Sequence, residues 1–282
     1  MLFLNTYQLF NEVRPSVPAV VYLGSMHITP TKPLPTDLQK IMDCATAGVV
    51  YFSLGSNVKS NQLSAEKRKI FLDAFSEMPY TVVWKWENDT LPDQPANVFT
   101  SKWLPQNDLL SHPNMKAFIS QVGLQSMEEA IHHSIPIVGI PFYADQEMNA
   151  KKVVMRGIGK HLSIETLTKK QLKDTVSEVI NNPVYHENLV SLREKMYDQP
   201  QTSLERAVWW TEYVLRHGGA KHLRSPGLNV PLYQYLMLDI LALIVLILAL
   251  FTFLVVLLIR LIKNNIVSTS ITSVERPKSK LS

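Results

Sequence analysis

Residues 103–149 read WLPQNDLLSHPNMKAFISQVGLQSMEEAIHHSIPIVGIPFYADQEMN, and this stretch decides the fold. Its apolar runs alternate with helical spacings, which predict a strand at 116–120, a helix at 124–133, a buried strand at 135–140 and a helix from residue 147. Continuous apolar strands of this kind belong to parallel sheets that are covered on both faces. The stretch therefore predicts two consecutive βα units with polar loops at the strand ends.

The flanking sequence extends this alternation in both directions. Apolar runs predict strands at 48–54, 81–86, 97–101 and 157–164, and helical spacing predicts helices at 64–78, 168–181, 183–197 and 202–217. Residues 48–217 are therefore expected to form one Rossmann-like α/β domain. Ligands of open parallel sheets bind outside the carboxyl ends of the strands, so the loops at those ends are the first candidates for a site.

The composition excludes several classes of protein. Of the 282 residues, 46% are hydrophobic, which suits a globular chain and not a disordered one. The net charge is +4 and the basic residues are dispersed, so no nucleic-acid partner is expected. The single cysteine, Cys44, excludes an intrachain disulfide, and no spacing of ligand-type side chains indicates a metal site.

The central stretch resembles the signature of the UDP-glycosyltransferase family, in particular its membrane-anchored, UDP-glucuronosyltransferase-like animal branch. The matching pieces are WLPQNDLL at 103–110, AFIS at 117–120, the polar-x-Gly turn, Glu129, IPIVGIP at 135–141 and ADQ at 144–146. Flanking resemblance covers nearly the whole chain, from about Arg14 onward. It implies the Rossmann-like C-terminal domain of a two-domain GT-B glycosyltransferase, with a UDP-sugar as donor substrate and no further cofactor or metal.

A UDP-sugar presents a flat base, a ribose diol, a diphosphate and a sugar ring, and the sequence offers a counterpart for each. Trp103 provides an aromatic face for stacking on uracil, and Gln106 an amide for the base edge. Glu129 provides a carboxylate that can accept from the ribose hydroxyls. Taken singly, Trp103 is more often a core residue and Glu129 a solvated helix residue, so the prediction depends on their joint order.

The diphosphate is expected at the N-terminus of the helix at 124–133, where free N–H groups and the helix dipole favour an anion. The residues predicted to surround it are Gln121, Gly123, Gln125 and Ser126, with Ser53, Gly55 and Ser56 closing over it from the first strand. Asp145 and Gln146 follow the strand at 135–140 and are expected to hold sugar hydroxyls. The alternative for Asp145 is an N-cap of the next helix.

The turn after residue 120 departs from the family's commonest pattern, His-Gly-Gly. Gln121 keeps a hydrogen-bond donor for the phosphate but carries no charge. Val122 is β-branched, which resists a positive φ, and its side chain is expected to crowd the diphosphate. Donor affinity is expected to fall if this position needs a left-handed backbone.

No catalytic residue is expected in this chain. In the family a histidine, oriented by an aspartate, deprotonates the acceptor, and both residues belong with the acceptor pocket to the N-terminal half. Residues 1–47 are rich in proline and are expected to be an interdomain linker with a remnant of that half, in a sequence that is the C-terminal part of a longer protein. His27 is interpreted as a linker histidine, and no His–carboxylate pair is expected in a loop facing the donor site.

The C-terminal region predicts a membrane anchor. Residues 240–259 carry no charge and one polar side chain, Thr252, over a length that spans a bilayer. The region is therefore divided into a juxtamembrane segment at 218–235, a transmembrane helix at 236–259 and a polar, basic tail at 260–282 that is too short to fold. Lys278 and Lys280 in this tail resemble a dilysine-type retrieval signal; the alternative is a basic tail held near anionic lipid.

The resemblance and the basic tail together predict a location. The chain is expected to be a single-pass protein of the endoplasmic reticulum membrane, with a lumenal donor-binding domain and a cytoplasmic C-terminus. Asn88 begins the sequon Asn-Asp-Thr and is a glycosylation candidate in that orientation.

Two functions are consistent with the sequence. The first is a UDP-glycosyltransferase that moves a hexosyl or glucuronosyl group to a small lipophilic acceptor, with this chain supplying donor binding and the anchor. The second is a catalytically inactive UDP-binding or interaction module that forms homo- or hetero-oligomers with related transferases and modulates them.

Overall fold

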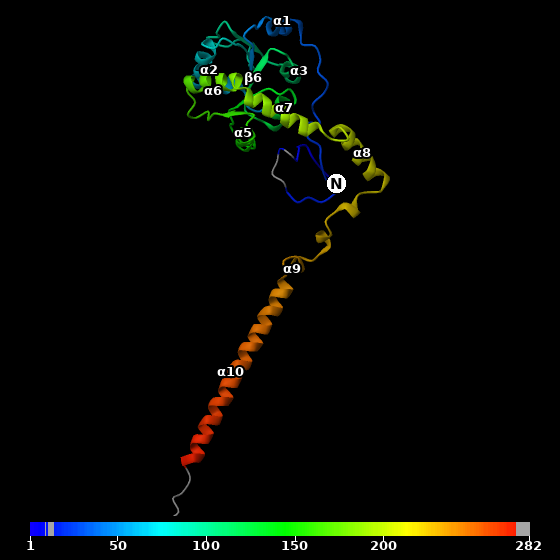
Figure 1. Cartoon of the computed structure of the whole chain (residues 1–282), viewed down its shortest axis with the longest axis vertical. Coiled ribbons are helices and arrows are strands. Elements are labelled where there is room, and N and C mark those ends of the chain that lie inside the picture. Colours follow the sequence, from blue (N-terminus) through cyan, green and yellow to red (C-terminus); the bar gives the residue numbers. More distant parts are fainter. Residues whose placement is uncertain (9, 11–13, 275–282) are drawn as a thin grey trace, which may run out of the picture. The chain divides into compact units, whose positions relative to one another are not determined.

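The structure, a computed structural model, describes residues 1–8, 10 and 14–274 of the chain (Figure 1). It divides into two units, Met1–Ala220 and Lys221–Ser282, which are described separately. The predictions made for Lys278 and Lys280 lie outside the described residues.

The first unit is built on a parallel sheet. Its strands are β3 (Val49–Ser53), β4 (Thr81–Lys85), β5 (Val98–Ser101), β6 (Met115–Ser120), β7 (Ile137–Gly139) and β8 (Gly159–His161). They lie in the order β5-β4-β3-β6-β7-β8, so the chain winds outward in one direction from β3 and in the other from β6. This is the doubly wound order, with its switch point between β3 and β6, where a crevice opens at the carboxyl ends of the strands. The predicted strands are confirmed, although β7 and β8 are shorter than expected.

Helices cover both faces of this sheet. The buried cluster on one face includes Val49 and Tyr51 of β3, and the cluster on the other face includes Val50 and Phe52. The first face is covered by α4 (Leu124–His132), α5 (Gln146–Met155) and α7 (Pro183–Tyr197), and the second by α2 (Ala65–Ser76) and α6 (Lys169–Asn181). A strand buried on both faces needs apolar residues at every position, which is why the runs in the sequence are continuous.

Capping residues fix where several helices begin. The Ser64 side chain accepts a hydrogen bond from the Lys67 N–H at the start of α2. Thr168 forms a capping box at the start of α6, and Thr202 forms another before α8 (Ser203–Arg216). Each cap satisfies backbone N–H groups that have no partner within the helix, so these starts are local properties of the sequence.

The N-terminal segment is more ordered than its proline content predicts. β1 (Leu2–Leu4) pairs in parallel with β2 (Val20–Tyr22), and a helix, α1, spans Thr36–Cys44. Met42 of α1 is fully buried in the first core cluster. This part of residues 1–47 therefore packs on the domain, and its role as an interdomain linker with a remnant of the N-terminal half stays a prediction.

The second unit contains one long helix. After η2 (Lys221–Leu223), η3 (Pro226–Asn229) and α9 (Leu232–Tyr235), the helix α10 spans Leu238–Val274. Its segment Leu238–Asn265 has a mean hydropathy of 3.4 and is, among the described residues, the one helix long and apolar enough to cross a membrane. Because α10 continues to Val274, the expectation that the tail is too short to fold is wrong for residues 260–274.

Candidate functional site

A cavity of about 390 Å³ opens at the carboxyl ends of β3 and β6, at the switch point of the sheet. Of the residues predicted to bind the donor, those that line it are Ser53, Gly55, Ser56, Trp103, Gln106, Gln125, Ser126 and Glu129. They come from the end of β3 and the loop after it, from the segment that follows β5 and from the first turns of α4. The fold thus gathers residues that are far apart in the sequence into one hollow.

Trp103 forms an open wall of this cavity. Its side chain is 77% exposed, so the alternative of a core tryptophan is wrong. Leu104, the next residue, is buried, and the short helix α3 (Gln106–Leu110) begins immediately afterwards. The buried neighbour and the helix hold the backbone in place, and the indole is left free to stack on a planar ligand.

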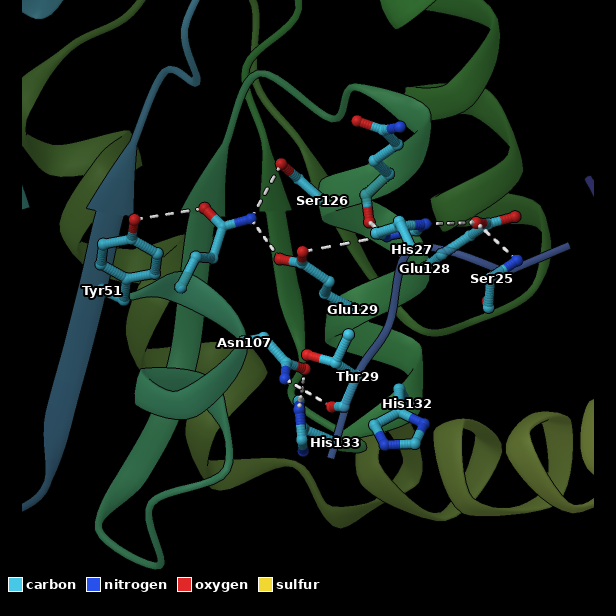
Figure 2. Close-up of polar contacts among 12 residues, drawn as sticks. Ser25, His27, Thr29, Tyr51, Asn107, Ser126, Glu128, Glu129, His132 and His133 are labelled. Atoms are coloured by element: carbon cyan, nitrogen blue, oxygen red, sulfur yellow. Dashed lines mark hydrogen bonds and ion pairs between the residues drawn. The ribbon is translucent and has the colours of Figure 1, made fainter. Parts of the chain in front are cut away.

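A chain of hydrogen bonds links residues that line the cavity, and Figure 2 draws these contacts. The Tyr51 hydroxyl donates to Gln106 Oε1 over 3.2 Å. Gln106 Nε2 donates to Ser126 Oγ over 3.0 Å and to Glu129 Oε2 over 2.5 Å. The Gln106 amide is thereby fixed in orientation and joins β3 to α4. Sequence reasoning missed Tyr51, whose hydroxyl needs a partner in an apolar strand.

Glu129 lies in a largely dry position. Its side chain is only 15% exposed, so the alternative of a solvated helix residue is wrong. Burial raises the pKa of Glu129, while the hydrogen bond from Gln106 and the charge of His27 act in the opposite direction. A partly buried carboxylate in this place can accept from two vicinal hydroxyl groups that enter the cavity.

The N-terminus of α4 faces the loop that follows β3. Its N-cap is Gly123, with no side-chain cap, so the first N–H groups of the helix are available to an anion. A Cβ on Gly55 would lie 2.4 Å from Gln121 Nε2, and one on Gly123 would lie 3.2 Å from the same atom. The Gln121 amide therefore lies between the two loops, and the φ of +80° at Gly55 is a left-handed backbone that favours glycine.

Val122 has a left-handed backbone, with φ of 59°, although a β-branched residue resists this conformation. Its N–H donates to Ser120 Oγ and its carbonyl accepts from Asn149 Nδ2, both over 3.0 Å. The side chain is fully buried, and its Cγ1 would lie 3.1 Å from a Cβ on Gly139 of β7. The expectation that Val122 crowds the diphosphate is therefore wrong, because the side chain points into the core.

Asp145 and Gln146 do not line the cavity. Gln146 is buried, and its Oε1 accepts from the backbone N–H groups of Phe142 and Tyr143. Asp145 is exposed and accepts from Asn149 Nδ2 over 2.8 Å, and it makes no side-chain cap for α5. Gln146 thus shapes the loop after β7, and the sugar-binding role of the two residues stays a prediction.

His27 lies beside two carboxylates of α4, while the expectation that no His–carboxylate pair occupies a loop facing the donor site stays a prediction. Its Nδ1 is 3.7 Å from Glu128 Oε2 and its Nε2 is 3.8 Å from Glu129 Oε1. The pair was missed because the partners are distant in the sequence and the segment around His27 carries no periodic pattern. His27 does not line the cavity, and it contacts the site through the Gln125 carbonyl, at 3.2 Å, and faces Glu129.

Other features of the described residues complete the site. Lys85 lines the cavity and pairs with Glu87 over 3.0 Å, which places a cation beside the hollow. Asn88 of the sequon is exposed, and its Oδ1 accepts from Asn61 Nδ2. Within the described part of the chain, no cluster of three or more His, Cys, Asp or Glu residues could hold a metal ion.

The sheet order, with a cavity at its switch point, defines an α/β domain of the Rossmann type. Residues 1–271 match the family profile described as UDP-glucoronosyl and UDP-glucosyl transferase. The chain belongs to this family of UDP-glycosyltransferases.

Characterised relatives agree with this assignment. UDP-glycosyltransferase UGT5 of Dactylopius coccus is 40% identical over 248 residues, which cover 88% of this chain and 47% of the relative. UDP-glucuronosyltransferase 2B15 of Rattus norvegicus is 42% identical over 241 residues, which cover 85% of this chain and 45% of the relative. The chain therefore spans about half the length of the relatives it matches.

Solved glycosyltransferase structures share the fold. Os79 from O. sativa in complex with UDP matches with a TM-score of 0.59 at 17% identity, over 70% of this chain and 50% of that one. The glycotransferase of kitacinnamycin matches with a TM-score of 0.56 at 22% identity, over 68% of this chain and 49% of that one. The fold is thus the α/β domain of a GT-B glycosyltransferase.

Proposed function

We propose that this chain is the donor-binding half of a UDP-glycosyltransferase that transfers a hexosyl or glucuronosyl group to a small lipophilic acceptor. The observation that carries the proposal is the cavity at the switch point. It combines an exposed indole, a fixed amide, a partly buried carboxylate and an uncapped helix N-terminus. These are the kinds of group that a base, a ribose and a diphosphate require.

Each part of the nucleotide has a proposed partner. Uracil stacks on Trp103, and its edge pairs with Gln106, whose amide lies beside the carboxylate that takes the ribose. The diphosphate takes the N-terminus of α4 and the loop at Gly55, with the Gln121 amide between them. Asp145 and Gln146 hold the sugar hydroxyls from the loop after β7.

The acceptor and the base that activates it belong, in this proposal, to the part of the relatives that the chain does not match. General-base assistance contributes about 10²–10⁴-fold to such a reaction. The chain alone is therefore expected to bind the donor and not to transfer the sugar.

The apolar segment Leu238–Asn265 supports a membrane anchor. We propose a single-pass protein of the endoplasmic reticulum membrane, with the donor-binding domain lumenal and the C-terminus cytoplasmic. The lipid bilayer is then a direct partner, and Asn88, exposed in a loop, is open to glycosylation.

A second candidate function is a UDP-binding module without catalysis, which joins related transferases as an oligomer. The observation in its favour is that the described residues lining the cavity include no histidine to act as a base. Co-expression with a relative that retains the other half distinguishes the two. A catalytic half is expected to restore transfer to a relative whose own donor-binding domain is disabled, whereas a module only changes an activity that is already present.

Thermal unfolding tests the donor assignment. A ligand that binds only the folded chain raises its unfolding temperature by mass action. UDP-glucose or UDP-glucuronate is expected to stabilise the full chain in detergent, whereas ADP-glucose is expected to have little effect. Equal stabilisation by ADP-glucose, or none by any UDP-sugar, would refute a uridine-specific site.

A further inference from the structure

The N-terminal segment 25–29 lies against the donor-site helix α4. The Ser25 N–H donates to Glu128 Oε2 over 3.0 Å, and Asn107 Nδ2 donates to the Thr29 carbonyl over 2.9 Å. Between these two attachments His27 Nε2 lies 3.2 Å from the Gln125 carbonyl. The segment is therefore held at both ends, and its histidine has a defined place.

His27 lies between two carboxylates, as Figure 2 shows. Its Nδ1 faces Glu128 and its Nε2 faces Glu129, at 3.7 Å and 3.8 Å. The exposed fractions of the three side chains are 20% for His27, 2% for Glu128 and 15% for Glu129. Glu128 and Glu129 are neighbours with little access to water, so they repel one another when both are charged, and the imidazole ring lies between them.

The two oxygens of Glu129 have different partners. Oε2 accepts a hydrogen bond from Gln106, and Oε1 faces His27 Nε2 at 3.8 Å, which is beyond hydrogen-bonding distance. The hydrogen bond fixes one oxygen, and the imidazole limits the space into which the other can rotate, so the carboxylate keeps its plane for a pair of vicinal hydroxyls.

We propose that His27 is a positioning residue for ribose recognition, which acts through Glu129 and is itself held in place by the Gln125 carbonyl, with Glu128 on its other side. The inference rests on the proposed function, since it assumes that Glu129 accepts from the ribose of a uridine nucleotide. His27 does not line the cavity, and it reaches two residues that do, Gln125 through its carbonyl and Glu129 through its carboxylate. It makes the N-terminal segment part of the donor site.

Two isosteric replacements separate the contacts of the ring. In His27→Gln the amide nitrogen takes the place of Nε2 and keeps a donor toward Glu129. In His27→Asn the shorter amide takes the place of Nδ1 and reaches only toward Glu128. His161→Asn is the matched control, because its Nε2 is also 3.8 Å from a glutamate, Glu147, but lies outside the cavity.

The readout is the ratio of the dissociation constants of 2′-deoxy-UDP and UDP, measured by calorimetry on the full chain in detergent. The parent, His27→Gln and the control are expected to share a preference for UDP. His27→Asn is expected to lower that preference at least threefold, mainly through weaker binding of UDP. A residue with a merely structural role would weaken both nucleotides by one factor and leave the ratio unchanged.

Each outcome decides the question. An unchanged ratio in His27→Asn, or an equal loss in His27→Gln and His27→Asn, would overturn the role of His27 and leave the donor site intact. A parent chain that binds UDP without any preference over 2′-deoxy-UDP would overturn the role of Glu129 as well. A parent that binds neither nucleotide would overturn the proposed function itself, and the inference with it.

Discussion

Gln106 donates a hydrogen bond to Glu129 over 2.5 Å, so the residue proposed for the base and the one proposed for the ribose form a single unit. Gln106 belongs to the short helix α3 and Glu129 to α4, and the Tyr51 hydroxyl holds the far side of the amide. The amide of Gln106 therefore cannot be moved without disturbing the carboxylate.

This coupling predicts non-additive effects on UDP binding. Gln106→Ala and Glu129→Ala are each expected to weaken binding, and the double variant is expected to lose about 0.5–3 kcal/mol less than the sum, the usual range for residues in contact. Calorimetry on the four chains of the cycle measures the difference. Strict additivity would mean that the hydrogen bond has no part in recognition.

Removal of the Trp103 ring is expected to remove stacking on the uracil base. Trp103→Ala is expected to weaken UDP binding by about 1–3 kcal/mol, and Trp103→Phe by less, because a smaller ring still offers a face. Trp209→Ala removes another exposed indole, on α8, and is the control that should bind UDP normally. Equal affinities in Trp103→Ala and the parent would place the base elsewhere.

The positive φ of Val122 leads us to expect an unusual order of stabilities among its variants. Val122→Ala loses buried methyl groups and keeps the positive φ, which costs a non-glycine residue about 1–2 kcal/mol. Val122→Gly loses one carbon more but relieves that strain. Urea unfolding of the full chain is therefore expected to rank Val122→Gly as at least as stable as Val122→Ala. A markedly less stable glycine variant would show that the left-handed backbone is not strained.

Burial of the Glu128 carboxyl is expected to make the stability of the chain depend on pH. Burial raises the pKa of Glu128 from 4.5 to about 7, with a smaller contribution from the charge of Glu129, while the hydrogen bond from Ser25 opposes it. The charged and titratable groups that face it are His27 of the N-terminal segment, Glu129 of α4 and Tyr197 of α7. The folded chain therefore loses the Glu128 proton at a higher pH than the unfolded chain does.

Because the pKa of Glu128 is higher in the folded chain than in the unfolded chain, protonation of this carboxyl stabilises the fold. This contribution to the free energy of unfolding is complete below pH 4.5 and is lost as pH rises through about 7. Glu128→Gln removes this dependence, so its stability relative to the parent is expected to grow by roughly 3 kcal/mol over that range, at about 1.4 kcal/mol per unit of pKa. Urea unfolding at pH 4.5, 6 and 8 measures it, and a difference that stays constant with pH would contradict the assignment.

Much of the first unit follows from local pattern. The continuous apolar runs that became β3 and β6 are long enough to identify without tertiary information, and α7 spans Pro183–Tyr197 as its spacing predicted, with the Asn182 side chain as its cap. The loops at the strand ends then place Trp103 and Glu129 at one edge of the sheet. These features depend on periodicity, capping and topology, which residues close together in the sequence determine.

The features that could not be predicted depend on distant contacts. α1 forms in a proline-rich segment because Met42 is buried in the core, and His27 meets α4 although about a hundred residues separate them. Val122 tolerates a positive φ because its side chain fills the space above Gly139. No local rule specifies which distant surface will receive a side chain.

The most direct test of the central claim is a calorimetric titration of UDP into the full chain in detergent, with Glu129→Gln and Glu187→Gln for comparison. Glu187 is an exposed glutamate of α7, outside the cavity. The parent and Glu187→Gln are expected to bind UDP at one saturable site, and Glu129→Gln to bind at least tenfold more weakly, because a hydrogen bond to a charged group contributes about 1.5–3 kcal/mol. A parent that does not bind UDP, or a Glu129→Gln variant that binds it as the parent does, would contradict the account.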